Sequence, residues 1–354
     1  MSFRPIAWGS AVAGLIGLTL STLSIVHAEV PKVVTSIEPI DALVAGVMGD
    51  LGTAQLLVQG GASPHTYALK PSDARALNDA DVVFRVGENL ETFLNHPLET
   101  LSEKATVVDL GEVDGVKTLN FREGVLWEKH HHEDAEHEHE DEHAHADEAH
   151  EHEYEVDHEH EHEAAHEHEH EHEHEAHHHD HHGVDPHVWL DPANARAMVD
   201  AIAATLAAAD PEHQDTYKEN AAKLNGQLAA LEEKVAEELA PVKGRNFIVF
   251  HDGYHYFEHR FGVEAVGSIA VSPEHQPGAA RVREIRDHIK DSGAICVFAE
   301  PQFKPQLVNT LIEGTSARSG VLDPLGADLK PGAGAYTQMM ENLAKNLHDC
   351  LAGS

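Results

Sequence analysis

The segment at residues 130–182 constrains the fold of this chain more than any other sequence feature. Its 53 residues contain 22 His and 22 Asp or Glu, with no Lys or Arg. A segment with so little apolar content cannot offset the entropy lost on ordering, which predicts a disordered, metal-binding loop. We expect weak, exchangeable metal sites there, and a solvated spacer with incidental metal affinity is the alternative. Folded structure must therefore lie before and after this loop.

Charge and the first residues limit where the chain works. The formal net charge of -38 is far too acidic for nucleic-acid binding. Arg4, a short apolar stretch and the small-residue site Val26-His27-Ala28 together predict a secretory signal peptide at residues 1–28. An uncleaved N-terminal anchor is the alternative. We therefore expect an exported protein.

The remaining apolar runs alternate between short β-branched strands and helical stretches, in two similar blocks. Four strands are predicted in each block, which is typical of a parallel sheet flanked by helices. The prediction is an α/β protein with an N-terminal lobe at 29–129, continued at 183–210, and a C-terminal lobe at 240–354. Between them, helical spacing of apolar residues over 211–239 predicts one long connecting helix.

Three histidines outside the loop occupy unusual places. His65 follows a Gly-Gly turn after the second predicted strand, His251 directly follows the first strand of the second block, and His187 lies between the first lobe and the next helix. Asp323 ends the last predicted strand. Ligands of open α/β sheets collect at the carboxyl ends of strands, so these four residues predict a shared metal site in a cleft between the lobes. The alternative is a set of separate structural residues.

The chain also resembles a known family in five motifs. These are GGASPHTYALKPSD, DPHVWLDP, VFHDGYHYFE, VFAEPQF and LDPLG, at residues 60–73, 185–192, 249–258, 297–303 and 322–326. Together they are similar to the periplasmic zinc-binding component of high-affinity zinc-uptake ABC transporters, the ZnuA type. The resemblance covers nearly the whole chain after the signal peptide, including the His-rich insertion.

The resemblance implies two α/β lobes joined by a rigid helix, with Zn²⁺ held between them and delivered to a membrane permease. The implied partners are this permease and, indirectly, the ATPase of the transporter. It implies a monomeric binding protein that is not an enzyme. His65, His187 and His251 match the three zinc-binding histidines of the family. Pro64 stands where some relatives carry an acidic residue, so the fourth ligand is either Asp323, which matches a carboxylate in related proteins, or water.

The sequence also suggests roles for the two cysteines and for several polar residues near the three histidines. Cys296 and Cys350 match a family pair that forms a disulfide in some relatives, whereas by themselves they permit either a disulfide or two buried thiols. Glu300 is a candidate hydrogen-bond acceptor for a ligand histidine. Asp252 is read as a cap of the helix that follows it. His255 and His259 are expected on a solvated helix face with aromatic packing beneath.

Two other functions remain open from the residues alone. Three imidazoles and a carboxylate or water suit tetrahedral Zn²⁺ better than the harder Mn²⁺, although copper competes for such sites. The same set also describes the open zinc of a hydrolase, which needs a general base beside the bound water. An exported metal buffer, with the His-rich loop as its main site, is the other alternative.

Overall fold

The computed structural model describes residues 30–122, 183–270, 277–304 and 306–353. The predicted signal peptide at 1–28 and the predicted loop at 130–182 lie outside the described residues. Within the described part of the chain, no helix is both long enough and apolar enough to cross a membrane.

The first sheet consists of four parallel strands in the order β2-β1-β3-β4. They are β1 (Val33–Thr35), β2 (Gln55–Leu56), β3 (Val82–Arg85) and β4 (Thr106–Asp109). Consecutive valines put side chains on both faces of β1: Val33 packs in one buried cluster and Val34 in another. A sheet that is buried on both faces in this way needs helices on both sides.

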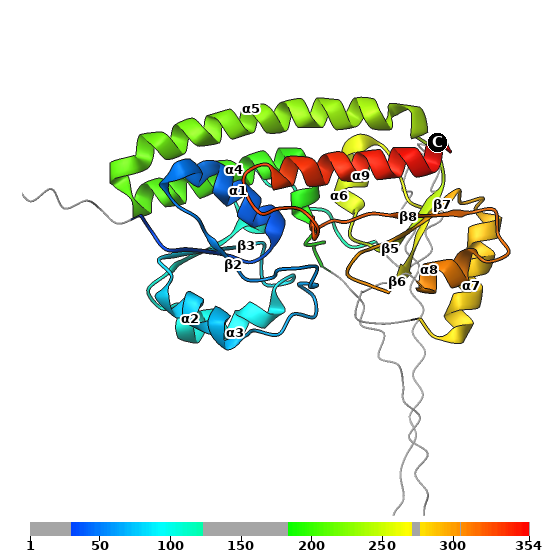
Figure 1. Cartoon of the computed structure of the whole chain (residues 1–354), viewed down its shortest axis with the longest axis horizontal. Helices are drawn as coiled ribbons and strands as arrows, with labels where there is room; N and C mark the ends of the chain where they lie inside the picture. Colours follow the sequence, from blue (N-terminus) through cyan, green and yellow to red (C-terminus); the bar gives the residue numbers. More distant parts are fainter. Residues whose placement is uncertain (1–29, 123–182, 271–276, 305, 354) are drawn as a thin grey trace, which may run out of the picture.

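Helices provide that cover (Figure 1). The helices α2 (Pro71–Asp79) and α3 (Asn95–Leu101) pack on the face of Val34, whereas α1 (Glu38–Met48) and α4 (Pro192–Ala209) pack on the face of Val33. A 3-10 turn, Val188–Leu190, leads into α4, and Asp191 caps this helix by accepting a hydrogen bond from the Ala193 amide.

The second sheet repeats the plan, with the parallel order β6-β5-β7-β8. Its strands are β5 (Phe247–His251), β6 (Gly267–Ala270), β7 (Cys296–Ala299) and β8 (Arg318–Val321). One face is covered by α7 (Ala279–Asp291) and α8 (Gln306–Ile312), and the other by α6 (His255–Phe261) and α9 (Ala335–Ala352). Thus the predicted pair of four-stranded parallel sheets is confirmed.

One long helix, α5 (Gln214–Leu239), runs across both sheets on the α1, α4 and α9 side (Figure 1). At 1.5 Å per residue, its 26 residues span about 39 Å. The 3-10 turns Pro211–His213 and Ala240–Val242 flank it, so the regular helix begins slightly after the predicted start. Its inner stripe joins one hydrophobic core that runs through both lobes, and consists of Tyr217, Ala221, Leu224, Leu228, Leu231, Val235 and Leu239.

Cys296 and Cys350 form a disulfide, so the alternative of two separate thiols is wrong. The bond joins β7 in the second sheet to the end of α9. Because 54 residues separate the two cysteines along the chain, the crosslink constrains much of the C-terminal lobe.

Candidate metal centre

The three predicted histidines come together from three different elements. His65 lies in the loop after β2, where Gly60 and Gly61 turn the chain with φ values of 67° and 75°. His187 immediately precedes the Val188–Leu190 turn, and His251 is the last residue of β5. One ligand atom from each side chain lies within 4.8 Å of the others, and this is the group of potential metal ligands found among the described residues.

The spacing of these rings suits one small cation. The Nε2 atoms of His187 and His251 lie 3.2 Å apart. Two nitrogens that each lie about 2.0–2.1 Å from a tetrahedral Zn²⁺ are about 3.3 Å apart, so the observed separation is close to that of a zinc site. The His65 ring centroid lies 5.4 Å from that of His187 and 5.7 Å from that of His251. Three imidazoles therefore surround one point.

Buried carboxylates orient two of the rings. The Nδ1 atom of His187 lies 2.7 Å from Asp185 Oδ1, and the Nδ1 atom of His251 lies 2.7 Å from Glu300 Oε1. An ionised carboxylate only accepts hydrogen bonds, so each Nδ1 carries a proton, and in the neutral ring each Nε2 presents its lone pair to the shared point. The role of Glu300 agrees with the sequence interpretation. The role of Asp185 was missed, although the Asp-x-His spacing in the DPH motif signals it.

Burial keeps two of the imidazoles neutral. It lowers the pKa of His187 and His65 well below the ordinary value, and the charge that neighbouring histidines would carry lowers both further. Burial also lowers the pKa of His251, but the Glu300 carboxylate outweighs it, and the net pKa of His251 is raised. At neutral pH two unprotonated nitrogens are available without competition from protons, which favours metal binding.

The surroundings leave room for little besides one ion. The cavity beside the rings, about 10 Å³, is close to the smallest that can hold one water. A Cβ at Gly253 would lie 2.5 Å from His251 Nε2 and 3.1 Å from His187 Nε2, so this glycine lets the backbone approach the site. Opposite, Trp189 packs on His187 and donates its Nε1 hydrogen to the Pro324 carbonyl.

Asp323 is not part of the histidine cluster in the described structure. Its Oδ1 accepts hydrogen bonds from Gln302 Nε2 and the Leu325 amide, and its Oδ2 accepts one from the Ala327 amide at 2.7 Å. These bonds hold the carboxylate in its own loop after β8. Its neighbours Pro324 and Leu325, by contrast, line the metal pocket.

The remaining polar residues near β5 differ partly from the sequence interpretation. Asp252 does not cap α6, since Tyr254 occupies the N-cap and Asp252 instead binds Arg122. His259 is exposed, as expected for a solvated helix face, above buried aromatic residues of α6. His255 is half-buried, and its Nδ1 lies 3.9 Å from Asp185 Oδ2.

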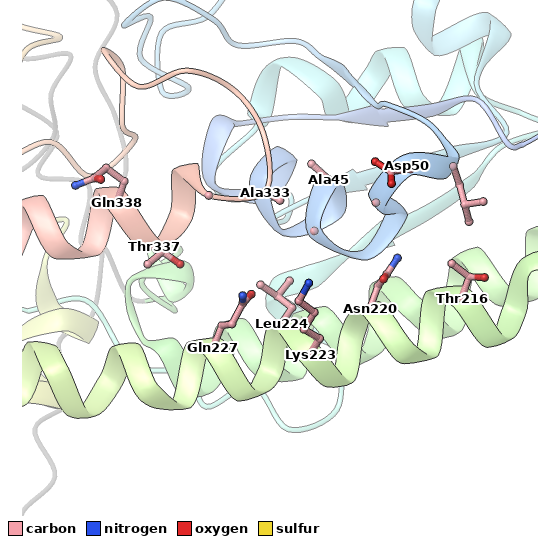
Figure 2. A pocket seen from close by; sticks show the side chains of 14 residues that line it. Ala45, Asp50, Thr216, Asn220, Lys223, Leu224, Gln227, Ala333, Thr337 and Gln338 are labelled. Carbon is pink, nitrogen blue, oxygen red and sulfur yellow. The ribbon is translucent and has the colours of Figure 1, made fainter.

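A larger hollow lies elsewhere. A groove of about 720 Å³ lies where α5 passes the end of α1 and the start of α9 (Figure 2). Its α5 wall presents Thr216, Asn220, Lys223 and Gln227 (Figure 2). Among the described residues, its lining includes no His or Cys and only one carboxylate, Asp50. That groove therefore lacks the ligands that a transition metal needs.

Comparison with known proteins agrees with this geometry. The family model described as zinc-uptake complex component A, periplasmic, matches residues 33–154 and 145–350. The chain is 51% identical to the high-affinity zinc uptake system protein ZnuA of Brucella suis biovar 1, over 97% of each chain. It is 43% identical to the protein of the same name from Paracoccus denitrificans, over 92% of this chain and 93% of that protein.

Solved structures show the same fold. A crystal structure of ZnuA matches with a TM-score of 0.66 and 22% identity, over 90% of this chain and 98% of that one. Because both the family model and these relatives span almost the entire described chain, the chain belongs to the ZnuA family, the periplasmic component A of zinc-uptake complexes.

Proposed function

We propose that this protein captures Zn²⁺ with His65, His187 and His251 and delivers it to the permease of a zinc-importing ABC transporter. The observation that carries the proposal is the convergence of three imidazoles from two lobes at the spacing of a tetrahedral site. Zinc is the cargo here and leaves with the transport cycle. The names of the relatives, which are zinc-uptake proteins, support the same ion.

The ligand set explains both retention and preference for zinc. Two ligand rings are held in place by buried carboxylates before any metal arrives, so little ordering is needed on binding. Three neutral nitrogen donors favour Zn²⁺ over Mn²⁺ or Mg²⁺, which prefer more oxygen ligands. The negative charges of Asp185 and Glu300, which contact the rings of His187 and His251, offset the positive charge of the bound ion.

The fourth coordination position is open to two ligands. Asp323 reaches the ion only if it leaves the three hydrogen bonds that hold it in its loop. A water needs no such rearrangement, and we therefore favour water with Asp323 as the alternative. An Asp323→Ala variant distinguishes them, because loss of tight binding would identify the carboxylate as a ligand.

The other parts of the proposal concern residues outside the described structure and the partners. We propose that residues 1–28 direct export to the periplasm and that residues 130–182 collect zinc for the cleft. We propose a monomer that meets the permease, and through it the ATPase, without nucleic acid. We also propose that the protein binds zinc without catalysing a reaction, since Glu300, the carboxylate beside His251, is already engaged by its ring.

Zinc titration calorimetry tests this proposal. The measurement compares the chain from residue 29 onward with a version lacking residues 133–182, and with His65→Ala, His187→Ala and His251→Ala versions of each. We expect one tight site that survives the deletion and is lost with each histidine. Absence of a tight site after the deletion would show that the His-rich loop is the main site, and would replace this proposal with a metal buffer.

A further inference from the structure

An isolated antiparallel bridge between Asn120 and Val184 lies at the base of the His-rich segment, and we call residues 119–122 and 183–185 the stem. The Phe121 amide donates to the Gly183 carbonyl at 3.0 Å, and the Asp185 amide donates to the Leu119 carbonyl at 2.8 Å. The two halves of the stem flank residues 123–182 in the sequence. The second half ends at Asp185, the carboxylate that orients His187. The stem therefore ends two residues before His187, a proposed ligand.

Helix α6 of the C-terminal lobe holds this stem. The Tyr256 hydroxyl donates to the Asp185 carbonyl at 2.7 Å, and accepts a hydrogen bond from the Leu119 amide at 2.8 Å. At the end of the stem, Arg122 spans two carboxylates. Its Nε donates to Asp252 Oδ1 at 2.9 Å, and its Nη1 donates to Glu258 Oε2 at 2.7 Å. Asp252 is the residue directly after His251.

The charges in this cluster depend on one another. The side chains of Asp252 and Glu258 are 8% and 3% exposed, and that of Arg122 is 15% exposed. Two carboxylates this deeply buried repel each other and remain ionised side by side only with a cation between them. If the guanidinium were removed, Asp252 would lose the partner that holds it beside Glu258, and a movement of Asp252 would displace the end of β5.

We propose that Arg122 is a positioning residue of the metal site: it fastens the stem that leads to His187 onto the residue that follows His251, and so sets the separation of their two Nε2 atoms. The inference rests on the proposed zinc-binding function and adds a residue to it. It also means that the base of the His-rich segment is joined directly to both lobes beside the metal.

The planar fork of the guanidinium is essential to this role. It donates to two carboxylates at once in a fixed geometry, whereas the ammonium of lysine is a point charge on a flexible stem. Arg122→Lys keeps the charge between Asp252 and Glu258 but loses the fork. Because groups that orient metal ligands change affinity by about 10- to 100-fold when altered, we expect zinc to dissociate at least about tenfold faster from this variant.

Arg260 offers a matched control, and it lies on α6, the helix that carries Glu258. It also binds two carboxylates, with its Nε 2.7 Å from Asp191 Oδ1 and its Nη1 3.5 Å from Glu232 Oε1, but neither of these acids adjoins a proposed ligand. Arg260→Lys therefore removes a comparable fork without touching the stem or the end of β5. If Arg122 acts only on stability, the two variants should differ from the parent in melting temperature alone.

The experiment follows zinc release from the full mature chain into excess chromophoric chelator, where the slow phase reports the tight site. Cobalt absorption spectra of the same proteins report the tetrahedral geometry. The expected result is faster release and an altered cobalt spectrum for Arg122→Lys, with parental values for Arg260→Lys. Should Arg122→Lys melt below the assay temperature, Asp252→Asn removes the negative charge from the same contact and carries the same expectation.

The outcomes separate this inference from the proposed function. Parental release and a parental cobalt spectrum in a folded Arg122→Lys protein would overturn the inference and leave zinc capture intact. An equal acceleration in Arg260→Lys would also overturn it, since the effect would then be general. Absence of a slow phase in the parent would refute the proposed tight site itself.

Discussion

Glu300 provides the sharpest test of how the metal site is prepared. Its carboxylate is 3% exposed, and it fixes the proton of His251 on Nδ1 through a 2.7 Å contact. Glu300→Gln retains an oxygen that accepts this proton but removes the negative charge that polarises the ring. Glu300→Ala removes both the charge and the acceptor, so Nδ1 is left buried without this partner.

The size of the effect follows from the geometry. The Glu300 contact is short, buried and charge-assisted, which places it among the stronger hydrogen bonds in proteins. Loss of such a ligand-orienting partner costs about 10- to 100-fold in metal affinity. At about 1.36 kcal/mol per tenfold, this corresponds to about 1.4 kcal/mol for the glutamine variant and about 2.7 kcal/mol for the alanine variant.

The assay is competition for zinc with a chromophoric chelator near neutral pH, on the chain lacking residues 133–182. Glu232→Gln is the matched control, because this carboxylate binds Arg196 and Arg260 well outside the metal pocket. We expect affinity to fall in the order parent, glutamine variant, alanine variant, with the control equal to the parent. Parental affinity in both Glu300 variants, with the fold intact, would refute the reasoning that this carboxylate prepares His251.

Three further predictions concern protons and stability. Zinc binding near pH 6 should release protons from His251, whose pKa is raised, and from Asp185, whose pKa burial raises to about 6, whereas the other two imidazoles are already neutral. Calorimetry in buffers of different ionisation enthalpy measures this, and release of three protons would contradict it. Burial raises the pKa of Asp210, but hydrogen bonds from His213 and Tyr217 outweigh burial, and the net pKa is lowered. The ionised carboxylate therefore stabilises the fold fully above the unfolded pKa, and this stabilisation is lost as pH falls through the lower folded pKa. Asp210→Asn should therefore cost about 1–3 kcal/mol in urea unfolding at neutral pH and little in strong acid, and a constant difference across pH would argue against it. Replacing Cys296 and Cys350 together by alanine should lower the free energy of unfolding by about 4 kcal/mol, as reduction of the parent should, and an unchanged denaturation midpoint would count against the crosslink.

The local pattern of the sequence was sufficient for the architecture. Short β-branched runs separated by helical stretches predicted both sheets, and the apolar spacing after Pro211 predicted the long helix. Helices and strands could be predicted in this way because the periodicity of apolar residues depends only on neighbours in the sequence. The same is true of His65 and His251, whose positions after strands placed them at the carboxyl ends of two sheets.

Contacts between distant segments were decided only by the tertiary structure. Nothing near Arg122 in the sequence indicates that it lies between Asp252 and Glu258, 130 and 136 residues further on. Asp323 lies two residues after the end of β8, close to its predicted place at the strand end. Amides of its own loop nevertheless donate to its oxygens, a competition that spacing along the chain does not reveal. Which partner satisfies a buried charge depends on what packs beside it in three dimensions. The sequence alone therefore determined the helices, the strands and the three converging histidines. The tertiary structure determined which residues hold those histidines in place.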